Sequence, residues 1–404
     1  EGSMNLNQKE KDMLEGKYGV GVANAMKILI GIGDAFYAER MVEVSRAHIS
    51  LSNQEGDLWF ANKLAEEGAR CCKLATVNPA FNKEYFENIC TFTDQELKVF
   101  EDTMRAYKKI GVVPTFQCTP YFVNNTPGFK EIVAFAATGA SCFVNSVCGA
   151  RTNRESSQSA LCSAVTGLTP LYGFLLDENR KADTLVEVEA EVKDDFDYQL
   201  LGYCVPKKIY TGVPVFTGLS HKPSSEALMN LSTQMNVHGV VPMFHVVGVT
   251  PEADTLEDAL QGEKPLRKFS ITKADLDEAR HTLSDGKGKI DFVVMGCPHL
   301  TISQISGIAT MLEGKKLKSE LWIFTSCLNK ELSQRMGLAG KIEEAGGRIV
   351  EDSCVDQPIW AHLEGKKGLT ESPKCAYYVS RRKMKLMVRS IPDCVNAAIK
   401  GEVN

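Results

Sequence analysis

Apolar, strand-like segments alternate with helical segments through the first part of the chain. Strands are predicted over residues 41–49, 71–77 and 112–117, and helices over residues 58–69 and 93–110. The longer helix begins with a capping box formed by Thr93 and Glu96, and Gly111 follows its last turn. Because strands separated by helices pair in parallel through right-handed crossovers, this alternation predicts an open parallel α/β sheet.

Polar side chains follow each predicted strand, and a fourth short strand is predicted over residues 142–144. In open parallel sheets, ligands bind outside the carboxyl ends of the strands. If the four strands are neighbours, their polar ends converge on one cleft. The side chains at these ends are His48, Ser50, Thr76, Asn78, Cys118, Thr119, Asn145 and Ser146.

A dense group of hydrogen-bonding side chains follows residues 142–144. Buried polar groups need partners, and a guanidinium group can grip a carboxylate with two parallel hydrogen bonds. This loop is therefore predicted to hold an anionic ligand, with the two arginines as clamps. In the alternative interpretation the loop is solvated, a serine caps the next helix, and the arginines pair with Glu155 or Glu178. The side chains are Asn145, Ser146, Arg151, Thr152, Asn153 and Arg154.

The rest of the chain predicts two further lobes, giving domains at residues 4–200, 201–285 and 286–404. A strand over residues 186–192 precedes the second domain, which is predicted to contain a helix at 228–235 and a buried strand at 240–249. The third domain is predicted to contain strands at 290–295, 321–325, 348–351, 376–380 and 385–388 and helices at 303–312, 330–345 and 394–399.

Charge and hydropathy exclude two classes of partner. The 404 residues include 46 lysines and arginines against 51 aspartates and glutamates, a net charge of −5. Without a basic block, nucleic-acid binding is not expected. No apolar run reaches the roughly 18 residues of a membrane-spanning helix. Residues 1–3 look like a cloning remnant, and since no secretory segment follows Met4, we expect a cytoplasmic protein.

Thirteen cysteines, an odd number without regular spacing, argue against a disulfide framework. No C-x-x-C pair suggests a zinc ribbon or a thioredoxin-type site. Three cysteines, Cys118, Cys297 and Cys354, each follow an apolar strand in a short turn. Thiolates on rigid loops are what an iron–sulfur cluster needs. The alternatives are a chance placement or a zinc site.

Several phrases spread over nearly the whole chain carry a family resemblance. They are NSVCGARTNRESSQSAL, TGLTPLYGF and DENR within residues 145–180, CTPY at 118–121, GCPH at 296–299, EDSC at 351–354 and DCVNAAIKG at 393–401. In this order they resemble aconitase X, an outlying branch of the aconitase superfamily of dehydratases. The resemblance implies an aconitase-like α/β fold: several α/β/α lobes with mostly parallel sheets around a central cleft.

The resemblance also implies a cofactor and a reaction. Aconitase-like dehydratases use an iron–sulfur cluster as a Lewis acid to eliminate water from a hydroxy acid. By this resemblance, Cys297 and Cys354 are expected ligands of the cluster. Cys118 is the expected third ligand, and Cys394 competes with it.

The sequence also predicts which residues act in catalysis and which bind the substrate. The predicted catalytic residues are His299, Ser146 and Lys374, and the predicted substrate-binding residues are His48, Asn78, Thr119, Asn145, Arg151, Thr152, Asn153 and Arg154. By the resemblance, Lys374 matches a family position, and Pro373 departs from the glycine expected before it.

Two substrates are implied by the family. The DCVNAAIKG ending and the absence of a glycine-rich phosphate loop favour cis-3-hydroxy-L-proline over mevalonate 5-phosphate. Two other hypotheses remain: a non-enzymatic iron–sulfur subunit of a larger complex, and a zinc or metal-free α/β enzyme.

A partner chain is also expected from the resemblance. Aconitases complete their cleft with a small swivelling domain, which in aconitase X is either fused or a separate subunit. The resemblance to the large subunit ends close to Asn404. The expectation is a large subunit that binds a small swivelling-domain subunit and is inactive alone.

Overall fold

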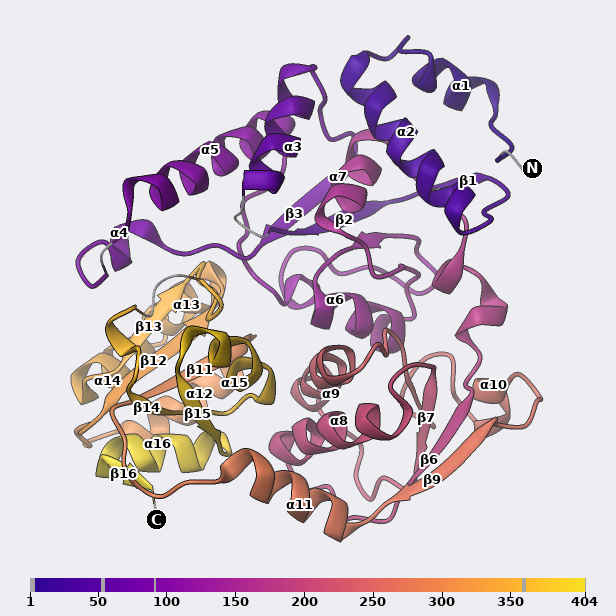
Figure 1. Ribbon diagram of the computed structural model, residues 1–404. Helices are drawn as coiled ribbons and strands as arrows, with labels where there is room; N and C mark the ends of the chain where they lie inside the picture. The colour runs from indigo at the N-terminus through magenta and orange to yellow at the C-terminus, as the bar shows by residue number, and fades with distance from the viewer. Residues whose placement is uncertain (1–3, 52–54, 91, 358–360, 404) are drawn as a thin grey trace.

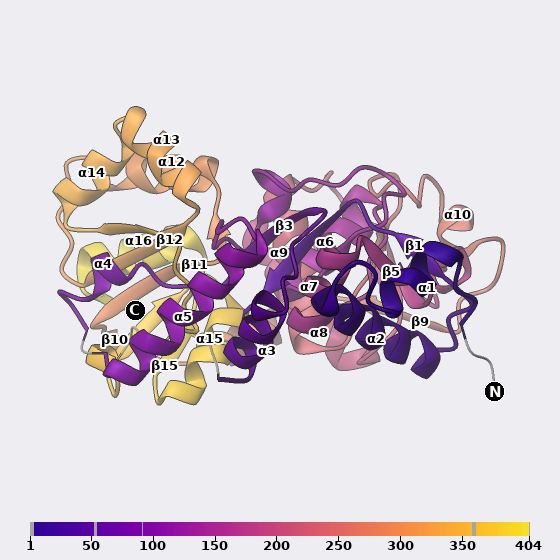
Figure 2. The same ribbon diagram turned by 90° about the horizontal axis from the view of Figure 1, so that it is seen from above.

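Three α/β lobes follow one another along the chain in the computed structural model (Figure 1). The structure describes residues 4–51, 55–90, 92–357 and 361–403. The first lobe lies at the top of Figure 1, the second at the lower right and the third at the lower left. Seen from above, the third lobe extends to one side of the other two (Figure 2). The predicted fold class, α/β lobes with mostly parallel sheets, is confirmed.

The first lobe is built on a parallel sheet of order β3-β2-β4, with a separate antiparallel pair, β1 and β5. Its capping box at Thr93 is confirmed, and Gly111 ends that helix with a φ of 95°. Its elements are α1 (Gln8–Leu14), α2 (Val20–Ala35), β1 (Met41–Glu43), β2 (Arg46–Ser50), α3 (Glu55–Glu66), β3 (Leu74–Asn78), α4 (Lys83–Phe86), α5 (Asp94–Ile110), η1 (Pro120–Phe122), β4 (Ala134–Phe135), α6 (Thr138–Phe143), η2 (Val144–Cys148), α7 (Ser157–Thr166) and β5 (Leu168–Pro170).

Two predicted strands of this lobe are wrong. Residues 112–117 form only an isolated bridge between Val113 and Thr76. Residues 142–144 end α6 and begin the π-helical turn η2. A three-residue apolar run fits a helix that is buried on all sides as well as it fits a strand. α6 is such a helix, because its residues from Gly139 to Phe143 are all buried, and a Cβ at Gly139 would lie 2.7 Å from Oγ1 of Thr233 in the second lobe.

The second lobe carries a parallel sheet of order β8-β7-β6-β9. The strand predicted over residues 240–249 is reduced to the two residues of β8. The domain division predicted at residue 200 falls inside α8. The elements are η3 (Gly173–Leu175), η4 (Asp177–Arg180), β6 (Thr184–Val188), α8 (Asp195–Ile209), β7 (Pro214–Thr217), α9 (Ser225–His238), β8 (His245–Val246), α10 (Leu256–Leu260), β9 (Arg267–Ile271) and α11 (Lys273–Ser284).

The third lobe has a five-stranded parallel sheet of order β13-β12-β11-β14-β15. Residues 376–380, predicted as a strand, lie largely in α15, and β14 was not predicted. The predicted helix over 330–345 is two helices that meet at Gly337 (φ 72°). The elements are β10 (Gly288–Lys289), β11 (Phe292–Leu300), α12 (Ile302–Leu312), β12 (Glu320–Thr325), α13 (Cys327–Arg335), α14 (Leu338–Ala345), β13 (Arg348–Glu351), β14 (Lys367–Thr370), α15 (Pro373–Val379), β15 (Lys385–Val388), α16 (Ile391–Lys400) and β16 (Glu402–Val403).

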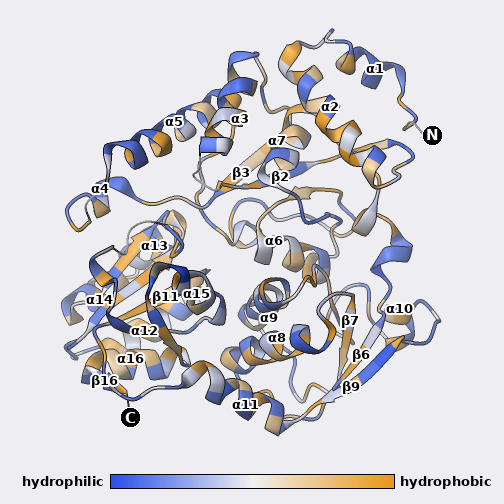
Figure 3. Ribbon diagram, in the orientation of Figure 1, coloured by the Kyte–Doolittle hydropathy of each residue, from blue (hydrophilic) through white to orange (hydrophobic). Residues whose placement is uncertain are grey.

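Apolar contacts join the first and third lobes. Figure 3 shows that the central strands of the sheets are hydrophobic, while the outer helices alternate between hydrophobic and hydrophilic residues. α4 packs on the third sheet, where Phe86 stacks on Trp322 with ring centroids 5.7 Å apart. This contact holds the loops that follow β3 and β13 next to each other. Within the described ranges, no helix is both long and apolar enough to cross a membrane.

Candidate active site

Three cysteines from two lobes gather around one histidine. Cys118 precedes η1 in the first lobe, Cys297 lies in β11, and Cys354 follows β13. The backbone N–H of His299 donates to Sγ of Cys118 over 3.3 Å. The His299 ring nitrogen Nε2 lies 2.7 Å from the carbonyl oxygen of Ser353, next to Cys354. The loops that carry the three cysteines therefore meet between the first and third lobes. The sequence had predicted a cleft at the ends of four neighbouring strands, and that prediction fails because residues 112–117 and 142–144 are not strands.

The three thiols share an environment with Lys374. Loss of hydration raises the pKa of Cys354 to about 12 and raises the pKa values of Cys118 and Cys297, while Lys374 opposes all three shifts. Burial alone would lower the pKa of Lys374, but the facing thiols, led by Cys297, raise it. A cation beside three thiols stabilises thiolates, the form that binds metals.

The thiols fit a metal cluster in chemistry. Cys297 is a buried residue, whereas the residues Cys118 and Cys354 are partly exposed. Among the residues that the structure describes, no three His, Cys, Asp or Glu side chains are close enough to hold a single metal ion. In an iron–sulfur cluster each thiolate binds a different iron, so its cysteines need only surround a common space.

Cys394, the competing third ligand, lies elsewhere. It is buried in the apolar core between the third sheet and α16, and its Sγ lies 3.6 Å from the carbonyl oxygen of Arg389. Cys118, and not Cys394, is among the groups that act on Cys297 and Cys354. Cys375, which the sequence did not single out, also acts on Cys297, and both cysteines pack in one apolar cluster with Phe292.

A second polar group lies at the carboxyl ends of β2 and β3. Nδ1 of His48 lies 2.7 Å from Oγ1 of Thr76, which also accepts a hydrogen bond of 2.8 Å from Asn125. Burial lowers the pKa of His48 to about 3, and the nearby Asn78 offsets part of that shift. Neither Nε2 of His48 nor Oδ1 of Asn78 makes a hydrogen bond of ordinary geometry within the described residues. Thr119 is buried beside Cys118.

His48 gives a prediction about pH. Its native pKa lies below the unfolded value of about 6.5, so the unfolded chain binds the extra proton. The stability that neutral His48 contributes is complete above pH 6.5 and is lost as pH falls toward 3. Between pH 5.5 and 4, wild type should lose up to about 1.4 kcal/mol per pH unit more than His48→Gln. Denaturant unfolding at several pH values measures this, and parallel curves would contradict it.

The loop after residues 142–144 uses most of its side chains to hold itself. Asn145 donates to the carbonyl oxygen of Thr152 over 2.9 Å and accepts from the Thr152 N–H over 3.0 Å. Ser146 accepts from the N–H of Phe244 over 3.0 Å. Asn153 accepts from the N–H of Phe174 over 2.9 Å. These contacts satisfy the groups that the sequence assigned to a ligand.

The two arginines of the loop differ in exposure. Arg151 is buried and forms an ion pair with Asp177, rather than with either glutamate considered from the sequence. Its Nη1 donates to the carbonyl oxygen of Leu175 over 3.1 Å. Arg154 is exposed, and its Nη1 lies 3.4 Å from Oδ1 of Asn236. Of the two, Arg154 is the one with a guanidinium group in contact with solvent.

Arg180, which the sequence did not single out, secures this loop. It is fully buried, its Nε lies 2.9 and 3.0 Å from the two carboxylate oxygens of Glu252, and its Nη2 donates to the carbonyl oxygen of Asn145 over 3.0 Å. Its only signal in the sequence is that it ends the DENR phrase.

Arg180→Lys should therefore destabilise the protein. Lysine cannot reproduce the planar fork of donors, and breaking a buried pair costs about 3–5 kcal/mol. Chemical denaturation measures the loss. The control is Arg105→Lys, because Arg105 forms an exposed pair with Asp102 and its replacement should change stability by about 0.5 kcal/mol or less. Equal stability of the two variants would show that the buried network does not hold the loop.

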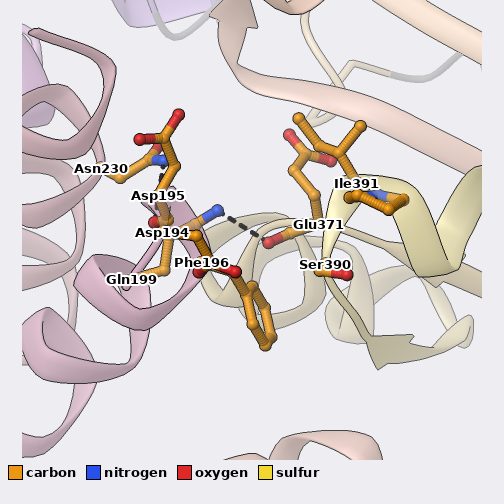
Figure 4. A pocket seen from close by; sticks show the side chains of 9 residues that line it. Asp194, Asp195, Phe196, Gln199, Asn230, Glu371, Ser390 and Ile391 are labelled. Atoms are coloured by element: carbon orange, nitrogen blue, oxygen red, sulfur yellow. Dashed lines mark hydrogen bonds between the residues drawn. The ribbon is translucent and has the colours of Figure 1, made fainter. Parts of the chain in front are cut away.

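A cavity of about 350 Å³ lies between the second and third lobes (Figure 4). Its walls come from α8 and α9 on one side and from the segments after β14 and β15 on the other. Gln199 donates to the carbonyl oxygen of Glu371 across it, over 2.8 Å. The lining residues are Asp194, Asp195, Phe196, Gln199, Asn230, Glu371, Ser390, Ile391 and Pro392.

Comparison with known families covers nearly the whole chain. Residues 3–178 match the aconitase X first domain, residues 182–281 the second domain and residues 290–400 the third domain. A solved structure, the holo-form of aconitase X from Thermococcus kodakaraensis, matches with a TM-score of 0.89 and 32% identity, covering 98% of this chain and 100% of that one.

Characterised relatives divide between two names. The chain is 36% identical to the phosphomevalonate dehydratase large subunit of Thermococcus kodakarensis, over 93% of this chain and 95% of the relative. It is 31% identical to the cis-3-hydroxy-L-proline dehydratase of Pseudomonas aeruginosa, over 98% of this chain and 70% of the relative. Both names describe the removal of water. The chain therefore belongs to the aconitase X family and is a dehydratase.

Proposed function

We propose that the chain is the large subunit of an iron–sulfur hydro-lyase that dehydrates a small hydroxy acid. The observation that carries this proposal is the meeting of Cys118, Cys297 and Cys354 from separate loops beside Lys374. The dehydratase names of the relatives support enzymatic activity over a purely structural iron–sulfur subunit.

Different residues of this chain would have different roles in the reaction. A bound cluster supplies a Lewis acid for the substrate hydroxyl. The three cysteines would hold it, and Lys374 would offset their negative charge. His299 has a fixed tautomer, because Ser353 presents a carbonyl oxygen and Nε2 must donate to it. Nδ1 of His299 is then an acceptor. It has no partner within the described residues and is available to a substrate or a water.

Two observations favour different substrates. The higher identity to phosphomevalonate dehydratase large subunits, over almost their full length, supports mevalonate 5-phosphate. Arg151 is held in an ion pair, so Arg154 is the arginine of this loop that is exposed. A single exposed guanidinium group suits a substrate with one anionic group better than a substrate with both a carboxylate and a phosphate. That observation supports cis-3-hydroxy-L-proline.

A small partner subunit is supported by the relatives that are named large subunits. A cytoplasmic location is supported by thirteen cysteines that are all free thiols, since a reducing compartment keeps them so.

One experiment tests the proposal. The chain is purified anaerobically together with its small subunit, iron and sulfide are quantified, and each substrate is assayed for loss of one water by mass spectrometry. The expected result is bound iron and sulfide and dehydration of one substrate only. Zinc, or no metal, in an active preparation would overturn the iron–sulfur assignment.

A further inference from the structure

The backbone around Cys297 leaves the regular strand ladder. β11 pairs with β12 in register up to Met295, and the register shifts before pairing resumes at Leu300. Backbone N–H groups inside such an irregularity lose their neighbours in the sheet. Because a buried N–H without an acceptor is costly, the N–H groups of Gly296 and Cys297 need an acceptor from outside the ladder.

A single carboxylate oxygen supplies that acceptor. Oε1 of Glu371 accepts from the N–H of Gly296 over 2.8 Å and from the N–H of Cys297 over 3.3 Å. Glu371 directly follows β14, the parallel neighbour of β11, so the two residues meet at the same end of the sheet. A charged acceptor makes stronger hydrogen bonds than a neutral one.

Glycine constrains the same turn from the other side. Gly296 has a φ of 112°, and a Cβ there would lie 2.2 Å from the carbonyl oxygen of Phe324 in β12. The turn therefore packs closely against the backbone of β12 on one side and is hydrogen-bonded to Glu371 on the other. The backbone that carries Cys297 is therefore restrained from both sides.

Glu371 is itself held from the second lobe. Its backbone oxygen accepts from Gln199 over 2.8 Å, and Gln199 accepts from Gln234 over 2.8 Å. The next residue, Ser372, caps α15, which carries Lys374. Glu371 is 4% exposed and has no lysine, arginine or histidine ion pair within the described residues. Burial raises the pKa of Glu371, and the N–H groups of Gly296 and Cys297 oppose that shift by stabilising its carboxylate. The carboxyl group is thus committed to the backbone of the cysteine turn.

We infer that Glu371 is a positioning residue that fixes the Gly296–Cys297 turn and, through its negative charge, lowers the reduction potential of a cluster bound by Cys297. The second half of this inference rests on the function proposed above. The first half concerns the chain alone. Cluster potentials depend on nearby charge, and a carboxylate within hydrogen-bonding distance of the ligand's backbone is a large local charge.

Two substitutions separate the two roles. Glu371→Gln keeps a carbonyl oxygen that can accept both hydrogen bonds but removes the charge. Glu371→Ala removes the acceptor. Hydrogen–deuterium exchange of the peptide that contains Gly296 and Cys297 in the metal-free protein should be unchanged in the first variant. In the second it should be faster by about tenfold, the effect of losing one net hydrogen bond.

The loaded protein gives the second readout. Glu371→Gln should bind iron and sulfide like wild type, with a higher reduction potential and an altered visible spectrum. Glu155→Gln is the matched control, because Glu155 is a buried carboxylate of the first lobe, 8% exposed, and its replacement should leave both the exchange at Cys297 and the potential unchanged.

The outcomes are distinguishable. Unchanged exchange in a folded Glu371→Ala variant would overturn the positioning role, as would equally fast exchange in both Glu371 variants. If Glu371→Ala does not fold, Glu371→Gln decides, because a wild-type potential in that variant would refute the charge effect. A wild-type protein without iron and sulfide would refute the proposed function and the charge effect together, while the exchange result still decides the positioning role.

Discussion

Cys297→Ala, Cys354→Ala and Cys118→Ala variants are expected to purify without bound iron or sulfide. Thiolate is the protein ligand of iron–sulfur clusters, and these three thiols are the ones that share a space with Lys374. Loss of a single ligand leaves an iron open to solvent and oxidation. Visible absorption and chemical analysis of anaerobically prepared protein measure the loss.

The control for this series is Cys394→Ala. Cys394 is as deeply buried as Cys297 but lies in the core beside α16. This variant should keep wild-type iron and sulfide, although its cavity costs some stability. If Cys394→Ala loses the cluster and Cys118→Ala keeps it, the third ligand has been assigned to the wrong cysteine.

The isolated chain is expected to be about 10²–10⁴-fold less active than the complex with its small subunit, the range contributed by one positioned acid or base. Relatives that match over 95% of their length are named large subunits, which implies that a second chain takes part. Closing the site also excludes water, which strengthens the electrostatic interactions inside it. Steady-state assays of the chain alone and with its partner measure the ratio.

A matched control tests whether the activity of the complex depends on the large chain. The complex assembled with Cys297→Ala should be inactive although the partner is intact. Full activity of the large chain by itself would contradict the prediction and would place the catalytic base among His48, His299, Ser146 and Lys374.

Much of the third lobe could be predicted from the sequence. β11, β12 and β13 are continuous apolar runs, so their ends, and the cysteines that follow or lie in them, could be recognised. β14 was missed because it is short and contains a glycine. As a result Glu371, which follows it, had no recognisable position at the end of a strand.

The polar loop at residues 145–154 shows where sequence reasoning stops. Its composition correctly indicated many buried polar groups, and nine-tenths or more of the side chains of Asn145 and Thr152 are indeed inaccessible. Composition does not tell whether such groups face a ligand or each other. Their partners, such as Arg180 and Phe244, are brought in by folding from distant positions, and only the structure identifies them.

The two-lobe origin of the cysteine site affects its biosynthesis. Cys118 is made before Cys354, which lies 236 residues later in the chain. At about 5–20 residues per second, the first thiol waits on the order of ten to fifty seconds before the last one is available. The three thiols are therefore together only once Cys354 has been made, and during that interval the waiting Cys118 thiol is open to oxidation.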